Sequence, residues 1–244
     1  MKSYLLILTF AFTSNCIAQE KFLITETINN DSLNRLDKTA FKVDKNNIFE
    51  DSVYIVSKSC SGEWGGTIKF KNKKSGIQYS AASTCPVTVT KFNDSYIVTN
   101  TLAHLSGSSE IIEISNPEDM TVFELPKPRK KKGKVIYRYV GDDETKSSKG
   151  IKSLVDSIGV QTLATFIFQG QLYHIITDFD KTYLTKIINR KFISIDTVSN
   201  ESLWTYKPEV FVTNDNHSIV FFDNQKAAGY IEIFENNIKV VRQK

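Results

Sequence analysis

A repeated short pattern constrains the fold of this chain more than any other feature. The segments FEDSVYIV, beginning at Phe49, and FNDSYIVT, beginning at Phe92, align Phe, Asp and Ser at a spacing of 43 residues. A third and weaker copy, FQGQLYHI, begins at Phe168. A period of about 20–50 residues is typical of folds that use one small unit several times. We therefore expect a β-rich unit of this length to recur along the chain.

Each repeat divides into four runs of β-forming residues separated by clusters of turn formers. In the second repeat, the connections are FNDS, HLSG and NPED, which are rich in Asn, Asp, Ser, Gly and Pro. The runs of that repeat cover about 86–91, 96–103, 109–115 and 120–125. The complete set of expected units is about 43–82, 86–125, an irregular unit at 126–160, 161–196 and 208–242.

The segment Tyr96-Ile97-Val98-Thr99-Asn100, followed by a turn and EIIEIS, resembles the Tyr-Val-Thr-Asn blade repeat of secreted β-propeller proteins. The resemblance covers one unit, and it implies a fold rather than an activity. Four-stranded units at this spacing are also typical of propeller blades. The expected fold is all-β and propeller-like, with about five four-stranded blades, one of them degenerate. A β-sandwich with internal duplication is the alternative.

One segment departs from the β pattern. In KGIKSLVDSIG (149–159), the residues Ile151, Leu154, Val155 and Ile158 have the spacing of one helical face. This spacing predicts a short helix within the irregular unit.

The N-terminal residues 1–18 have the features of a secretory signal peptide. Lys2 is followed by an apolar run and by Cys16-Ile17-Ala18, a small-x-small cleavage site before Gln19. The run is shorter than the ~18 residues of a membrane span, and no later run is long enough. Lipidation of Cys16 is the rival interpretation, although no Leu-like residue stands three positions before it. Both interpretations predict an exported mature domain covering 19–244.

Cys60 and Cys85 are the two cysteines that remain after removal of a signal peptide. In an oxidising compartment they are expected to form a disulfide, with two free thiols as the alternative. Such a crosslink would stabilise the fold by about 3 kcal/mol. Alternating strand directions place both cysteines at the same end of their units, which favours the pairing.

The same alternation gathers candidate ligand-binding residues at that end. They combine aromatic surface, carboxylates and an imidazole, which suits a ligand-binding face. These residues are Glu63, Trp64, His104, Asp178 and Asp180. Each also has a simpler interpretation: a packing anchor for the tryptophan, a corner hydrogen bond for the histidine, and turn positions for the aspartates.

Catalytic motifs are absent from the sequence. It contains no Gly-x-Ser-x-Gly elbow, His-Glu-x-x-His helix, phosphate-binding loop or Cys-x-x-Cys pair. The three histidines are not expected to converge on a metal, so no catalytic residue, metal or cofactor is predicted. A carbohydrate-acting hydrolase remains an alternative if Glu63, Asp178 and Asp180 provide carboxylates about 5–9 Å apart.

Basic residues concentrate in LPKPRKKKGK (125–134), although the net charge of +4 is too small to predict a nucleic-acid-binding protein. This basic patch consists of Lys127, Arg129, Lys130, Lys131, Lys132 and Lys134. It is interpreted either as a solvated loop between units or as a contact for anionic partners. A surface adhesin that uses residues 127–134 is therefore a further alternative.

The function favoured by the sequence is that of an exported, non-catalytic binding or scaffold protein. A rigid β framework would present its loops to a protein or glycan partner, and the chain is expected to be a monomer without a transmembrane segment.

Overall fold

The computed structural model describes residues 21–29, 47–125, 130–135, 139–206, 208–212, 217–224 and 228–243. These residues form four sheets of four or five strands and one two-stranded hairpin, with two short 3-10 helices, Gly62–Trp64 and Pro117–Asp119. The all-β prediction is therefore confirmed. The expected signal peptide, Cys16, Lys127 and Arg129 lie outside the described residues.

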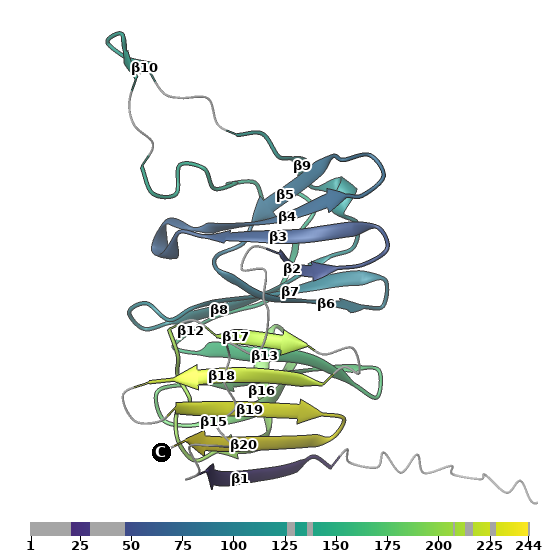
Figure 1. Ribbon diagram of the computed structural model, residues 1–244, viewed down its shortest axis with the longest axis vertical. Helices are drawn as coiled ribbons and strands as arrows, with labels where there is room; N and C mark the ends of the chain where they lie inside the picture. Colours follow the sequence, from purple (N-terminus) through teal and green to yellow (C-terminus); the bar gives the residue numbers. More distant parts are fainter. Residues whose placement is uncertain are drawn as a thin grey trace, which may run out of the picture.

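Each sheet is built mainly from strands that follow one another in the chain (Figure 1). The first sheet has the order β2-β3-β4-β5-β9, with β2 (Asn47–Glu50), β3 (Tyr54–Cys60), β4 (Gly66–Asn72), β5 (Gln78–Ala82) and β9 (Thr121–Val122). The second has the order β12-β8-β7-β6, with β6 (Pro86–Phe92), β7 (Ser95–Leu102), β8 (Ser108–Ile114) and β12 (Lys152–Ile158).

The second half of the chain forms the other two large sheets. The third sheet has the order β13-β14-β15-β16, with β13 (Gln161–Phe168), β14 (Gln171–Thr177), β15 (Thr182–Ile188) and β16 (Lys191–Ser199). The fourth has the order β1-β20-β19-β18-β17, with β17 (Glu209–Val212), β18 (Ser218–Asp223), β19 (Ala228–Phe234), β20 (Asn237–Gln243) and β1 (Leu23–Asn29). Strand β1 pairs in parallel with β20, so the two ends of the described chain meet in one sheet.

The three copies of the repeated sequence pattern occupy equivalent places in the first three sheets. Each covers the turn between the first and second strands: 51–53 between β2 and β3, 93–94 between β6 and β7, and 169–170 between β13 and β14. Asn93 and Asp94 both have positive φ angles, 46° and 62°. Two consecutive residues with positive φ are typical of a tight hairpin turn, which explains why turn formers recur at this position.

Successive sheets pack on one another through three apolar cores. Strand β7 shows why the second sheet is apolar on both faces: Val98 packs in the core shared with the first sheet, and Ile97 packs in the core shared with the third. The third core joins the third and fourth sheets and includes Tyr173 and Phe222. Among the described residues, no such core joins the fourth sheet to the first.

One segment of the expected irregular unit differs from the predicted helix. Residues 152–158 form strand β12 at the edge of the second sheet, so the predicted helix is wrong. A bulge between Ser153 and Val155 interrupts the alternation of this strand, and Leu154 and Val155 both pack in the core between the second and third sheets. The bulge thus produced the helix-like spacing of apolar residues.

The edge strands of the first two sheets also differ from those of the expected units. The run expected as the fourth strand of the second unit, 120–125, is reduced to β9, which pairs with β5 of the first sheet. The fourth strand of the second sheet is β12 instead. The described residues within 126–160 therefore contribute no four-stranded sheet of their own. Their other described strands are the hairpin of β10 (Lys130–Lys131) and β11 (Lys134–Val135).

The two ends of the sheets have different connections. At one end, which we call the turn end, two-residue turns such as 93–94, 169–170, 189–190 and 235–236 join the strands. At the other, the loop end, lie four connections of four or more residues: 61–65, 103–107, 178–181 and 200–208. There are exceptions at each end: 73–77 at the turn end has five residues, and 159–160 at the loop end has two. Longer connections on a rigid scaffold are where binding residues concentrate in proteins, so the loop end is the place to look for a site.

Candidate binding surface

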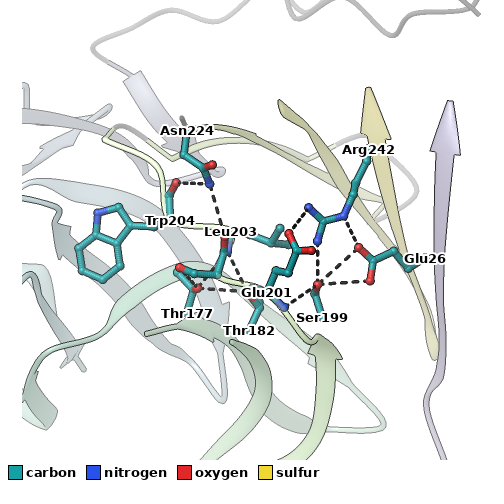
Figure 2. A network of polar contacts seen from close by, with 10 residues as sticks. Glu26, Thr177, Thr182, Ser199, Glu201, Leu203, Trp204, Asn224 and Arg242 are labelled. Carbon is teal, nitrogen blue, oxygen red and sulfur yellow. Dashed lines mark hydrogen bonds and ion pairs between the residues drawn. The ribbon is translucent and has the colours of Figure 1, made fainter. Parts of the chain in front are cut away.

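Contacts between loops join all four sheets at the loop end. Glu63, after β3, lies 3.3 Å from His104, after β7, measured between Oε2 and Nδ1. Trp204, before β17, stacks on Phe179, with ring centroids 4.7 Å apart. The Asn224 side chain donates a hydrogen bond of 2.9 Å to the carbonyl of Trp204 (Figure 2). The loops therefore form one continuous surface rather than four separate tips.

Gly107 of the 103–107 loop lies directly against Trp204 of the 200–208 connection. Its φ is +73°, and a Cβ added to it would lie 2.1 Å from Cη2 of Trp204. A residue with a side chain is disfavoured at this φ and would also collide with the indole. The glycine thus allows the 103–107 loop to rest directly on Trp204.

Hydrogen bonds hold residues 200–206 of the 200–208 connection (Figure 2). The backbone N–H of Leu203 lies 3.2 Å from Oγ1 of Thr177 and 3.1 Å from Oγ1 of Thr182. The backbone N–H of Thr205 donates to Oε1 of the buried Gln161 at 2.9 Å. This connection is therefore a rigid part of the surface.

The Cys60–Cys85 disulfide expected from the sequence fixes the loop end of the first sheet to the start of the second. The two Cα atoms are 4.4 Å apart. Cys60 ends β3 and Cys85 directly precedes β6, so the crosslink holds the junction beside the Glu63–His104 pair.

Trp64 has a fixed backbone and an exposed side chain. The Lys146 Nζ donates to the Trp64 carbonyl at 3.0 Å, and a Cβ on Gly141 would lie 2.8 Å from Cβ of Trp64. Trp64 as a whole residue is nevertheless 59% exposed. The predicted role of a packing anchor fits the backbone of this residue, whereas the ring is left available for a partner.

Glu144 anchors the segment that supports Trp64. Its buried carboxylate accepts hydrogen bonds from the hydroxyls of Ser59 at 2.5 Å, Thr67 at 2.6 Å and Ser61 at 2.7 Å. Burial alone would raise the pKa of Glu144, but these hydroxyls favour the carboxylate and the pKa is lowered. No local sequence pattern marks Glu144, because the residues that bind its carboxylate precede it by 77 residues or more.

Asp178 and Asp180 lie in the 178–181 turn of the third sheet. The Asp178 carboxylate accepts the backbone N–H groups of Asp180 at 2.8 Å and Lys181 at 2.7 Å. This is the turn-stabilising role of an Asp side chain. Among the described contacts, none joins either aspartate to Glu63 or His104, so the structure brings together only part of the predicted constellation.

The large apolar side chains most exposed to solvent concentrate at the loop end. Ten such side chains in the described residues are at least 59% exposed, and seven of the ten belong to loop-end segments. We call these seven the loop-end surface: Trp64, Leu105, Tyr139, Val140, Ile158, Phe179 and Tyr206. A monomer rarely gathers this much apolar surface on one side without using it for binding.

A pair of carboxylates not singled out from the sequence lies on the second sheet. Glu110 on β8 is the direct cross-strand partner of Asp156 on β12. Burial, with a contribution from the Asp156 charge, raises the pKa of Glu110, while the Asn100 amide, 3.3 Å away, acts in the opposite direction. Glu110 lies on the same face of β8 as the buried Ile112 and Ile114. A charged residue among apolar residues at alternating positions was the feature of the sequence that could have identified this pair.

Two open grooves lie elsewhere on the described surface. One, of about 530 Å³, runs between 121–124 and 143–147, and the other, of about 470 Å³, runs between 21–26 and 196–200. Neither is lined by Glu110, Asp156 or the predicted site residues. The first groove has carboxylates of its own, from Glu124, Asp143 and Glu144, but the predicted site residues lie outside both grooves.

Clusters of metal-ligating groups and membrane-spanning helices are both absent from the residues that the structure describes. Among the residues that the structure describes, no three His, Cys, Asp or Glu side chains are grouped so that they could hold a metal ion. In the same residues, no helix has the length and apolar character needed to cross a bilayer.

Comparisons with models of protein families, with curated proteins and with solved structures found no match for this chain. The fold and the surface define the class: an all-β protein of four packed sheets with a continuous, apolar loop end.

Proposed function

We propose that this chain is an exported, propeller-like binding protein that recognises a protein partner through its loop-end surface and has no catalytic role. One observation carries the proposal: seven strongly exposed apolar side chains share the end that carries the connections 61–65, 103–107, 178–181 and 200–208. Aromatic residues on rigid loops bind well because little conformational entropy is lost when they are covered.

The propeller-like arrangement is supported by the first strands of the sheets. Strand β6 contacts β2, β13 and β17, and each of these begins the run of consecutive strands in its own sheet. First strands that meet around a common line are expected when sheets are arranged radially. The resemblance of Tyr96–Asn100 to the blade repeat of secreted propeller proteins agrees with this arrangement.

A protein partner fits the surface better than a glycan. Glycans stack on aromatic faces and form hydrogen bonds, but they leave aliphatic side chains without a matching contact. Leu105 and Ile158, which are 82% and 77% exposed, would gain little from a sugar and much from the apolar core of a protein interface. Export is supported by the disulfide, since such crosslinks persist in oxidising compartments.

The alternative of a carbohydrate-acting hydrolase receives less support from the geometry. Glu63 is paired with His104, and the Asp178 carboxylate is engaged by two backbone N–H groups of its own turn. Replacing Glu63, Asp178 and Asp180 together would abolish turnover if this alternative were correct, and activity on a broad glycan panel is the direct check.

Site-specific photo-crosslinking tests the binding proposal. A photoreactive residue is placed at Trp64, Leu105 or Tyr206 on the loop end, and at Ile77, Ile188 or Val212 on the turn end as matched exposed controls. In cells that express the protein naturally, a discrete crosslinked protein is expected from the loop-end positions alone. Equal crosslinking from both ends, or crosslinking to glycan alone, would contradict the proposal.

A further inference from the structure

A lysine-rich arm leaves the first sheet and returns to it. Strand β9 leads into the arm, and the backbone N–H of Phe123 donates to the Gln78 carbonyl at 2.7 Å. On the return, Glu144 is held by three hydroxyls, and the Ser147 side chain accepts a hydrogen bond of 2.8 Å from Thr121. Both roots of the arm are thus fixed on the same sheet.

The described tip of the arm is the β10–β11 hairpin, which pairs with no other strand and stands away from the four sheets (Figure 1). Its turn consists of Lys132 and Gly133, with φ angles of 49° and 76°. Lys130, Lys132 and Lys134 are all exposed. No carboxylate among the described residues forms an ion pair with any of these three lysines. Their positive charges therefore repel one another without a counter-charge from the described fold.

Exposed apolar residues accompany these lysines. Leu125, Val135, Tyr139 and Val140 flank or belong to the hairpin, and each is at least 59% exposed. A soluble anionic polymer would neutralise the lysines but would give the aliphatic side chains nothing to contact. An anionic lipid surface provides both, because lysines bind its headgroups while Val, Leu and Tyr side chains enter the boundary with the acyl chains.

We propose that the β10–β11 arm docks this protein on an anionic lipid surface. Lysine suits such a surface, since its ammonium group is a point charge on a flexible stem that needs no fixed geometry of phosphate groups. This lipid contact uses residues other than those of the loop-end surface, except for Tyr139 and Val140, which belong to both.

Vesicle binding tests the proposal with the purified protein. Vesicles of phosphatidylglycerol and phosphatidylcholine are compared with vesicles of phosphatidylcholine alone, and binding to the anionic vesicles is expected to weaken as salt is raised. The triple variant Lys130→Gln/Lys132→Gln/Lys134→Gln is expected to bind at least about 10-fold more weakly, since each lysine near such a surface contributes roughly 5-fold. The matched control neutralises the exposed Lys71, Lys74 and Lys191 on the sheets and should change binding less than about 2-fold.

A second variant distinguishes lipid from other polyanions. Leu125→Ser/Val135→Ser keeps every charge and should weaken vesicle binding while leaving binding to dextran sulfate unchanged. Because these residues lie outside the sheet cores, the thermal midpoint should be preserved in both variants. If the lysine variant binds vesicles as tightly as its control, or if the apolar variant binds vesicles like the parent, the proposal is wrong.

Discussion

Arg242 and Glu26 join the last and first strands of the fourth sheet through a charged hydrogen bond (Figure 2). The same guanidinium donates to Glu201 at 2.9 Å and to Ser199 at 3.1 Å, both located where β16 leads into the 200–208 connection. One side chain therefore ties the parallel strand β1 to its neighbour β20 and to the end of the third sheet.

Replacing this arginine should loosen the attachment of β1. Arg242→Met keeps the aliphatic stem and removes the fork of donors, and a loss of about 1 kcal/mol in the free energy of unfolding is expected for a partly exposed network. Urea denaturation measures the loss, which should shrink at high salt. Lys152→Met, which removes the exposed pair with Glu113, is the control and should change stability less. Equal losses in the two variants would contradict the special role of Arg242.

Gly107→Ala should destabilise the loop end through two effects. The new Cβ disfavours a φ of +73° and meets the Trp204 ring, so a loss of about 2–3 kcal/mol is expected. Gly159→Ala is the matched control, because Gly159 also has a positive φ of +85° but nothing lies within 4 Å of its Cβ position. The control should cost about 1 kcal/mol. A larger loss in the control would show that the contact with Trp204 is unimportant.

Glu144→Gln should destabilise the protein in a pH-dependent manner. Because the pKa of Glu144 is lowered in the folded state, its contribution is fully present above the ordinary value of 4.5 and is lost as the pH falls below it. At pH 7 the variant is expected to lose about 1–3 kcal/mol, since a carboxylate that accepts three hydroxyls is replaced by an amide. Chemical denaturation across pH 3–7 should show the two proteins converging in acid. A constant difference would contradict this account.

His174 should make the protein sensitive to acid. It is buried between the second and third sheets, its Nδ1 lies 2.9 Å from Oγ1 of Thr165, and burial lowers its pKa from 6.5 to about 3. The unfolded chain binds a proton between these two values and the folded chain does not, so this contribution falls as the pH falls from 6.5 towards 3. The full loss amounts to about 5 kcal/mol.

The measurement for His174 is a comparison of unfolding free energies between pH 7 and pH 4. His174→Leu removes the titrating group, so the stability of the variant should depend less steeply on pH than that of the parent. Parallel curves for the parent and His174→Leu would disprove the prediction.

Removing the disulfide should cost about 3 kcal/mol on the chain-entropy account, because 25 positions of sequence separate the two cysteines. Cys60→Ser/Cys85→Ser and the reduced parent should show the same loss in denaturant. If the doubly substituted protein is as stable as the oxidised parent, the crosslink contributes little to the fold.

Most strands were predictable because their signals are local. Alternating apolar residues and turn pairs such as Asn93-Asp94 act within a few positions of one another, and the structure follows them closely in β6 to β8. The position of Cys60 and Cys85 at the same end of the sheets was predicted from strand direction alone. Edge strands were harder, since nothing near Thr121 or Lys152 specifies which sheet accepts it.

The site was less predictable than the fold. Strand direction placed Glu63 and His104 at one end, and the structure brings them into contact. The exposure of Leu105, Ile158 and Tyr206 depends on how distant loops pack, which no local pattern encodes. The same is true of Glu144, whose role is defined by hydroxyls from the first sheet.

The parallel pairing of β1 with β20 has a consequence for biosynthesis. Residues 23 and 237 are register partners, so the fourth sheet can be completed only after residue 237 has been synthesised. Until then, Phe22 and its neighbours lack part of the apolar site formed by the third and fourth sheets. The fourth sheet therefore stays incomplete while the strands of the first three sheets are being synthesised.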